Sequence, residues 1–393
     1  MSRQPKPLDQ QIIVITGATS GIGLATARAA AKAGARLVLA ARSAKDLREV
    51  AQQLEQDGGH VATVAADVAK PADVARIAEA ARSHFGGLDT WVNNAGVGIF
   101  GRIEDGNADD HHRLFETNFW GIVNGSLEAV KHFKQHGGGA LINLGSVVSD
   151  VAIPLQGMYS ASKHAVKGFT DALRIELEHE KAPVTVTLIK PAAINTPFNV
   201  NARNYTDHEL QLPPPVYAPE EVANAILHAA VHPMRDIYVG GGGKVMSVTN
   251  KFAPGVMDWI SAKAIPGQEM SDKPAHNPEG GLQQPGLGGH AHSDYPGHVM
   301  KTSLYTRTTL HPVLAGTLAA AGVAAAVALL GGNFSWGKLK DAGVKLEDSG
   351  PADPAPAPRP APEDEGQKPG NVKPTDPKKS AIKQQPMMPD TDE

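Results

Sequence analysis

The stretch QIIVITGATSGIGLA, residues 11–25, decides the fold of this chain. It opens on an apolar, β-branched run of the kind that forms a buried parallel strand. A loop with three glycines follows, and an alanine-rich helix is predicted over residues 24–33. Such glycines let the backbone approach a pyrophosphate, and the helix N-terminus offers unpaired N–H groups with a partial positive charge. We therefore predict a dinucleotide-binding site; the alternative is an ordinary glycine-rich turn.

Further apolar runs continue the alternation of strand and helix that this stretch begins. Additional strands are predicted at residues 36–40, 61–66, 90–92, 140–144, 184–189 and 237–239. Helices are predicted at residues 71–84, 109–136, 159–180 and 219–232. Strands that alternate with helices indicate βαβ units and a parallel sheet.

The end of the second predicted strand bears on the choice of cofactor. Arg42 follows this strand, and the two residues before it are alanines, so no acid stands there. NAD sites usually carry an acid at this place for the ribose 2′-hydroxyl, whereas an arginine suits a 2′-phosphate. The pattern favours NADP(H) over NAD(H); the alternative is a solvated arginine at a strand end.

A tyrosine and a lysine, Tyr159 and Lys163, lie four residues apart in a predicted helix and so project from the same face. An ammonium one turn away favours the phenolate, and we expect it to lower the tyrosine pKa from about 10 towards neutrality. Ser146 follows the strand at 140–144, where a hydroxyl can lie beside the tyrosine. Such a pair also occurs by chance, with the tyrosine packed and the lysine solvated.

Five features occur in order along the chain: TGxxxGxG at 16–23, NNAG at 93–96, Asn118, Ser146 and YxxxK at 159–163. In this combination the chain resembles the short-chain dehydrogenase/reductase family over roughly residues 8–250. The resemblance implies an α/β Rossmann fold, a doubly wound parallel sheet of about seven strands flanked by helices. It also implies hydride transfer between C4 of a nicotinamide cofactor and an alcohol or carbonyl carbon.

The resemblance further implies roles for single residues. Tyr159 would be the general acid in reduction, and Lys163 would lower its pKa and hold the nicotinamide ribose. Ser146 would position the substrate oxygen, and Asn118 would help to hold a water in a proton relay. The cofactor-binding set would comprise Gly17, Ser20, Gly21, Ile22 and Gly23 in the glycine loop, Arg42 at the 2′-phosphate, Asp67 and Val68 at the adenine end, Asn94, Ala95 and Gly96 towards the adenosine ribose, Tyr159, Lys163, Pro191 and Ile194, and Thr196 at the carboxamide.

One position departs from the family pattern. Family members usually have Pro-Gly after the sixth strand, and this chain has Pro191-Ala192. If the glycine used a positive φ, a methyl group at this position would reshape the nicotinamide pocket.

Composition excludes several classes of function. The net charge of -4 gives no sign of a nucleic-acid partner, and the absence of cysteine excludes disulfides, thiolate catalysis and thiolate metal ligands. No metal site is expected, because the histidines near residues 276–298 are interpreted as solvated. The first eleven residues are polar and contain two prolines, unlike a signal peptide, so we expect a cytoplasmic protein.

The chain continues well beyond the family-like region of residues 8–260. Residues 261–305 are rich in Gly, Pro and His and are predicted to be a linker, and residues 336–393 a disordered tail. Residues 306–335 are predicted to hold one apolar helix. Its segment 313–330 has eighteen residues without a charge, at the lower edge of what spans a bilayer. We predict membrane association with the catalytic domain on the cytoplasmic side; the alternative is a helix packed on the protein.

The substrate class is only weakly indicated. The loops expected to line the pocket are 97–105, 147–157 and 193–217. Within and beside them, residues 96–101, residues 147–154 and Phe198 are mostly small or apolar, which favours a lipophilic alcohol or carbonyl compound. The connection after the sixth strand is long enough to be a lid or disordered. The resemblance implies a homodimer or homotetramer. Two rival functions stay open: a non-catalytic NADP-binding scaffold, and epimerisation or dehydration on the same fold.

Overall fold

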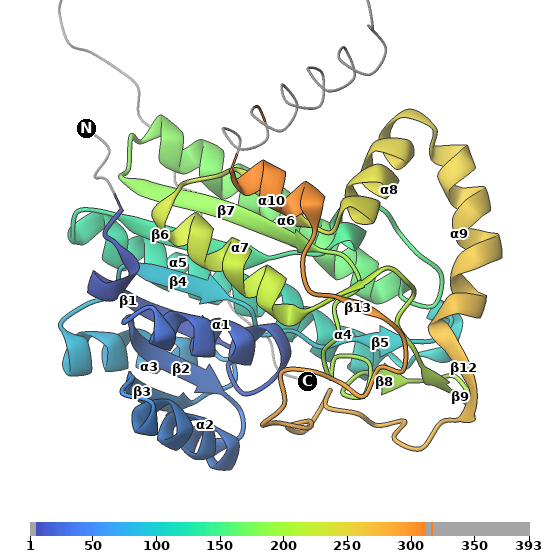
Figure 1. The fold of residues 1–393 in the computed structure, drawn as a ribbon, viewed down its shortest axis with the longest axis horizontal. Helices are drawn as coiled ribbons and strands as arrows, with labels where there is room; N and C mark the ends of the chain where they lie inside the picture. The colour runs from blue at the N-terminus through green and yellow to red at the C-terminus, as the bar shows by residue number, and fades with distance from the viewer. Residues whose placement is uncertain (1–4, 312–315, 317–393) are drawn as a thin grey trace, which may run out of the picture. The chain divides into compact units, whose positions relative to one another are not determined.

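The computed structural model describes residues 5–311 and residue 316. Its centre is a seven-stranded sheet in the order β11-β7-β6-β4-β1-β2-β3, and every neighbouring pair is parallel (Figure 1). The strands of this sheet are β1 (Ile12–Thr16), β2 (Arg36–Ala41), β3 (His60–Ala65), β4 (Thr90–Asn93), β6 (Gly139–Leu144), β7 (Val184–Pro191) and β11 (Asp236–Val239). The predicted Rossmann fold is thereby confirmed.

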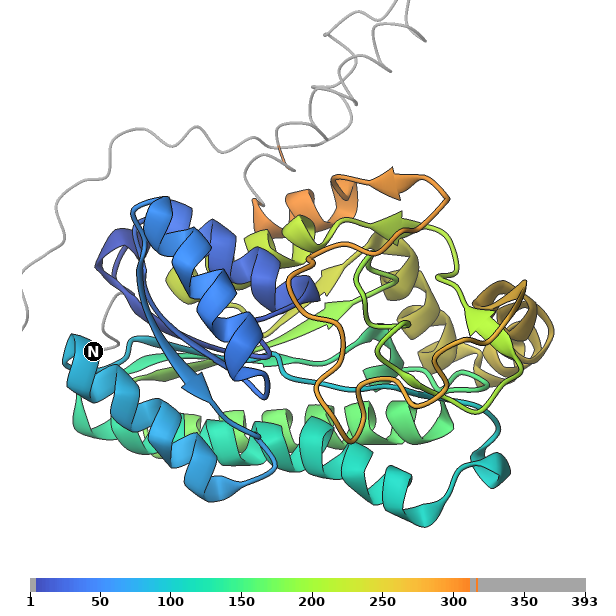
Figure 2. The same cartoon turned by 90° about the horizontal axis from the view of Figure 1, so that it is seen from below.

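Helices cover both faces of the sheet, as Figure 2 shows from the side. One face carries α1 (Gly21–Lys32), α2 (Ala44–Gln56) and α7 (Pro219–Val231), and the other carries α3 (Pro71–Phe85), α5 (Gly121–Gln135) and α6 (Gly157–His179). In β1, Ile13 and Ile15 join the first core, while Ile12 and Val14 join the second. Side chains alternate between the faces of a strand, so a strand buried on both faces is apolar throughout.

The chain order creates a crevice at one edge of the sheet. From β1 the chain continues outward to β2 and β3, whereas β4 lies on the opposite side of β1. Ligands of open α/β sheets bind beyond the carboxyl ends of the strands at such a switch point. The glycine loop follows β1 at this place.

The helix predicted over 109–136 is interrupted at its middle. It consists of α4 (Ala108–Phe115), a π-helical turn at Glu116–Trp120, and α5. The π turn contains Asn118, whose side chain is fully buried. Single π turns in α-helices occur frequently at functional sites.

The chain beyond β11 forms helices and short strands against the same domain. The helices are α8 (Gly241–Phe252), α9 (Pro254–Glu269) and α10 (Leu304–Leu310). Three small ladders pair β5 (Ile99–Phe100) with β8 (Arg203–Asn204), β9 (His208–Leu210) with β12 (Met270–Pro274), and β10 (Val216–Tyr217) with β13 (Val299–Met300). The connection after β7 was predicted to be a lid or disordered. Its strands β9 and β10 pair with β12 and β13, so this connection is ordered.

Residues 261–305 lie on the domain, although their composition predicts a linker. Leu282 is 0% exposed and Ala291 is 3% exposed, and Gly281 N–H donates to the carbonyl of Asn201 at 2.7 Å. The segment is held largely through its backbone, and such contacts do not depend on apolar side chains. Glycine and proline content therefore does not separate a free linker from a segment bound in this way.

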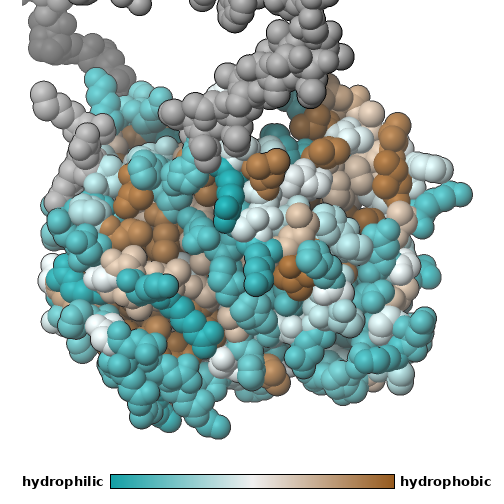
Figure 3. Space-filling view, in the orientation of Figure 1, coloured by the Kyte–Doolittle hydropathy of each residue, from teal (hydrophilic) through white to brown (hydrophobic). Residues whose placement is uncertain are grey.

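No helix in the described part of the chain is long and apolar enough to cross a bilayer. The apolar segment 313–330 lies outside the described residues except for Gly316, and so does the tail at 336–393. Figure 3 shows apolar surface over α8 and α9, where Val245, Phe252 and Trp259 are exposed. Membrane association through 313–330 stays a prediction from sequence.

Candidate active site

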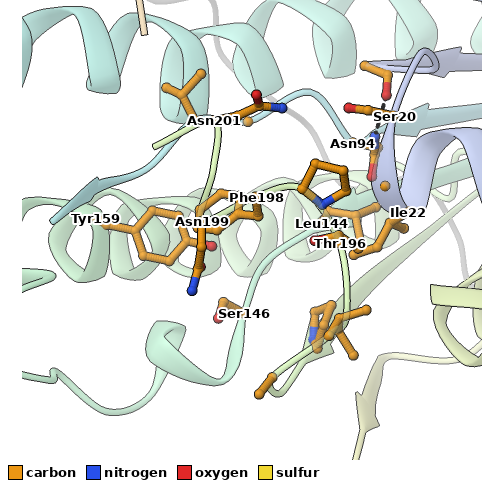
Figure 4. A pocket seen from close by; sticks show the side chains of 18 of the residues that line it. Ser20, Ile22, Asn94, Leu144, Ser146, Tyr159, Thr196, Phe198, Asn199 and Asn201 are labelled. Atoms are coloured by element: carbon orange, nitrogen blue, oxygen red, sulfur yellow. Dashed lines mark hydrogen bonds between the residues drawn. The ribbon is translucent and has the colours of Figure 1, made fainter. Parts of the chain in front are cut away.

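A cavity of about 530 Å³ extends along the carboxyl ends of the strands, from Arg42 to Tyr159. Figure 4 shows Ser20 and Asn94 on one side of it, and Tyr159 and Ser146 on the other. The structure brings nearly all predicted site residues to this one cavity: Gly17, Ser20, Gly21, Ile22, Arg42, Asp67, Val68, Asn94, Ala95, Gly96, Ser146, Tyr159, Lys163, Pro191, Ile194 and Thr196. Gly23 and Asn118 are buried behind its wall.

The glycine loop is shaped for close backbone approach. Gly17 has φ +65° and Gly21 has φ +53°, conformations that L side chains rarely adopt. A Cβ on Gly23 would lie 2.1 Å from the carbonyl oxygen of Gly17, so only glycine fits there. Because α1 begins at Gly21, the first N–H groups of the helix lie at the cavity wall. This geometry fits the pyrophosphate of a dinucleotide.

Asn94 ties the loop after β4 to β1. Its backbone N–H donates to Thr16 Oγ1 at 3.0 Å, and its amide Nδ2 donates to the carbonyls of Thr16 at 2.9 Å and Gly17 at 3.2 Å. Ala95 N–H also donates to Thr16 Oγ1. The NNAG segment therefore fixes the glycine loop against the neighbouring strand.

Asp67 and Arg42 mark the adenosine end of the cavity. A carboxylate oxygen of Asp67 accepts from Arg113 at 2.7 Å. Arg42 has no carboxylate within ion-pair distance in the described part of the chain, and its guanidinium donates to the backbone carbonyls of Leu282, at 2.9 Å, and Gly281. Burial and the charge of Arg113 lower the pKa of Arg42.

The segment 281–290, which we call the strap, lies over this end of the cavity. In addition to the contacts with Arg42, the carbonyl of His290 accepts from Gly21 N–H at 3.0 Å, and Gly289 N–H donates to Thr19 O at 2.8 Å. The strap residues Gly286 and Leu287 line the cavity. Sequence reasoning missed the strap, because backbone carbonyls leave no signature in residue types.

The predicted catalytic residues come from two elements. Ser146 follows β6, and Tyr159 and Lys163 lie one turn apart on α6. Ser146 lies beside the Tyr159 hydroxyl, and the tyrosine ring lies 5.3 Å from that of Phe198 between centroids. Lys163 Nζ donates to the carbonyl of Leu144 at 2.8 Å and lies 5.7 Å from the centroid of the tyrosine ring.

The protonation states differ from the sequence-based expectation. Burial raises the pKa of Tyr159 to about 12, and the neighbouring Ser146 side chain opposes this shift. Burial lowers the pKa of Lys163 to about 8. We expected the tyrosine pKa to fall towards neutrality, and for these side chains taken alone that prediction was wrong. Desolvation of the phenolate raises the pKa by more than the Lys163 ammonium, which lies more than 5 Å from the ring centre, lowers it. At neutral pH the tyrosine is therefore a protonated donor.

Asn118 supports the site from behind. Its Oδ1 accepts from Val97 N–H at 2.8 Å, and its Nδ2 donates to the carbonyl of Val97 at 2.9 Å and to Ser162 Oγ at 3.3 Å. The side chain thus joins the loop after β4 to the helix that carries Tyr159.

Ala192 adopts an ordinary backbone conformation, despite the departure from Pro-Gly. Among residues 5–311, only Leu155 and Lys181 are non-glycine residues with positive φ. Ala192 N–H donates to the carbonyl of Val239 at 2.9 Å, and its methyl group lines the cavity. The methyl is therefore accommodated without backbone strain.

A family model described as short chain dehydrogenase matches residues 11–207. The chain belongs to the short-chain dehydrogenase family. It is 44% identical over 327 residues to a Bacillus subtilis protein described as an uncharacterized oxidoreductase, a match that covers 82% of this chain and 92% of the relative. Such a match cannot fit within residues 8–260, so it includes part of the C-terminal extension. This short-chain dehydrogenase is an oxidoreductase.

Two solved structures share the fold. A short chain dehydrogenase/reductase from Burkholderia phymatum in complex with NAD is 25% identical, with a TM-score of 0.55, and the match covers 69% of this chain and 100% of that one. L-sorbose reductase from Gluconobacter frateurii, complexed with NADPH and L-sorbose, is 29% identical, with a TM-score of 0.53 and coverage of 61% and 98%. One structure holds NAD and the other NADPH.

Proposed function

We propose that this short-chain dehydrogenase transfers hydride between NADP(H) and an alcohol or carbonyl group, on a substrate with a mainly apolar body. The observation that carries the proposal is the single cavity that joins Arg42 at one end to Ser146, Tyr159 and Lys163 at the other. Its substrate end is lined largely by apolar side chains, among them Phe100, Val148, Ile153, Phe198, Met246 and Ile265.

Bound NADPH would supply a hydride to the carbonyl carbon. Tyr159, protonated at neutral pH, donates its proton to the carbonyl oxygen, so that the carbonyl gains one hydride and one proton. Ser146 holds the same oxygen in place by hydrogen bonding, and Lys163 holds the cofactor ribose. Oxidation of the alcohol runs the same transfers in reverse.

The experiment that tests this proposal is NADPH oxidation by the full chain against a panel of lipophilic and small polar carbonyl compounds. We expect turnover that is faster for the lipophilic members. Binding of NADPH without consumption by any carbonyl would support the scaffold alternative. Conversion of substrate without net NADPH consumption would indicate epimerisation or dehydration.

The NADP preference leads to a mutational prediction. Arg42→Ala is expected to raise the KM for NADPH by about 10–100-fold, the value of a charge-assisted hydrogen bond, with a smaller effect for NADH. Binding of the 2′-phosphate requires that the guanidinium exchange the carbonyls of Gly281 and Leu282 for phosphate oxygens. Initial rates with both cofactors measure this. The exposed Arg48 provides the matched control, Arg48→Ala, which should change neither KM; an equal rise for both cofactors in Arg42→Ala would contradict the preference.

We also infer a homodimer or homotetramer formed through the two long helices. Leu127 on α5 and Ile175 on α6 are 55% and 62% exposed, and large exposed apolar side chains on neighbouring helices support burial in an interface. Light scattering is expected to give twice or four times the chain mass, and a monomer mass would disprove the inference. Cytoplasmic location stays a prediction from sequence.

A further inference from the structure

The apolar substrate end of the cavity contains one buried acid, Glu269. This is the last residue of α9, and its side chain is 1% exposed. It lines the same cavity as Ser146 and Tyr159. No motif of the family-like region includes it, because it belongs to the C-terminal extension.

Only one of the two carboxyl oxygens of Glu269 has a hydrogen-bond partner. Oε1 accepts from Gln156 Nε2 at 2.6 Å, whereas Oε2 is buried and has no hydrogen-bond partner within residues 5–311. Gln211 does not donate to Oε2. The backbone N–H of Gln211 donates to the carbonyl of Glu269, and its Nε2 donates to the carbonyl of Met270. Burial raises the pKa of Glu269 to about 7, which the hydrogen bond from Gln156 opposes. A buried oxygen without a partner is costly, so the site favours a ligand that supplies a donor.

Gln156 connects this carboxyl to the helix that carries the reacting tyrosine. Gln156 is the N-cap residue of α6 and precedes Tyr159 by three residues, about one helical turn. A carboxyl bonded to Gln156 therefore adjoins the turn that carries the tyrosine. The backbone of Glu269 is fixed by the bond from Gln211, so the side chain is held on a supported element rather than on a free loop.

We propose that Glu269 recognises a hydroxyl group that the substrate carries at a distance from its reacting carbonyl. A hydroxyl brings one donor, which matches the one unoccupied carboxyl oxygen, whereas an ammonium group brings three. The substrate class is thus a hydroxyketone, or the corresponding diol, with an apolar segment between its two oxygens. This inference rests on the proposed function, since it assumes that the cavity beside Tyr159 binds the substrate.

The test compares straight-chain 2-alkanones of five to nine carbons with their ω-hydroxy counterparts. Their kcat/KM values are measured by NADPH oxidation with the full chain. Their affinities are measured separately by calorimetry with the full-length Tyr159→Phe variant and saturating NADP⁺, where turnover is blocked. For at least one chain length we expect the hydroxyketone to be preferred by roughly 10–100-fold in both measurements.

Two substitutions decide whether Glu269 is responsible. Glu269→Leu should abolish or reverse the preference, measured as the ratio of the two kcat/KM values within each pair. Glu269→Gln should keep most of the preference, because an amide still hydrogen-bonds a hydroxyl. Glu279→Leu, an acid of the same extension whose side chain is 78% exposed, is the matched control and should change nothing. A merely structural glutamate would affect both members of each pair equally.

The outcomes separate this inference from the proposed function. Equal affinity for both members at every chain length, or no binding of any hydroxyketone, overturns the role of Glu269, even if other carbonyls are reduced. A preference that survives Glu269→Leu also overturns it. If no carbonyl of any kind is reduced, the proposed function fails, whereas a binding preference that depends on Glu269 would still establish the hydroxyl site.

Discussion

Replacing Tyr159 by phenylalanine is expected to lower kcat for carbonyl reduction by about 10²–10⁴-fold, the usual contribution of a positioned proton donor. The hydroxyl that lies beside Ser146 is lost. The aromatic ring, which lies 5.3 Å from that of Phe198, is kept. Cofactor binding and thermal stability should therefore change little, and NADPH fluorescence titration together with thermal unfolding measures both.

The control for this variant is Tyr295→Phe, which removes a hydroxyl from a half-buried tyrosine of the extension, outside the cavity. It should have the kcat of the wild type. If Tyr159→Phe retained more than about a tenth of the wild-type kcat, the proton donor would have to be another group. If the variant lost NADPH binding as well, the hydroxyl would be needed to bind the cofactor, and the expectation that Tyr159 acts only in proton transfer would be rejected.

Gly23→Ala is expected to lower the free energy of unfolding by about 1–3 kcal/mol, as overpacking in a close-packed region does. The added methyl would lie 2.1 Å from Gly17 O and 2.5 Å from Asn94 Nδ2, so the glycine loop must move. Cofactor affinity should fall with stability, because the same loop faces the cavity. Chemical denaturation and NADPH titration measure the two effects.

Gly255→Ala is the matched control, since it makes the same change at an exposed glycine of helix α9. A Cβ at this position meets nothing within 4 Å. Alanine within a helix is favoured over glycine by about 0.5–1 kcal/mol, so this variant should be slightly more stable than the wild type. If the two substitutions changed the free energy of unfolding equally, the close contact between Gly23 and Gly17 would not contribute to the effect of Gly23→Ala.

The central sheet and most of the site could be predicted because their signals are local. The β1 strand is apolar on both faces, and the helix that follows it begins inside the glycine loop. The spacing of Tyr159 and Lys163 is that of one helical turn, and Ser146 lies two residues after the end of a strand. In each case, neighbours in sequence determine which side chains meet.

The contacts of Arg42 and Glu269 could not be predicted, because they depend on segments distant in sequence. Arg42 donates to carbonyls about 240 positions away, and Gln156 meets Glu269 across 113 positions. The tyrosine pKa was misjudged for a related reason. Charge spacing along a helix can be read from sequence, whereas desolvation depends on everything that packs around the hydroxyl.

The ribosome adds two parts of the cavity wall long after it has added the last family motif. All the family motifs are present once the ribosome has added residue 163, yet Glu269 and the strap come more than a hundred residues later. A nascent or shortened chain that stops near residue 260 would carry every motif and lack two walls of its cavity. For this protein, the positions of the motifs therefore do not indicate the C-terminal boundary of the complete cavity. Shortened chains made for expression should end beyond α10.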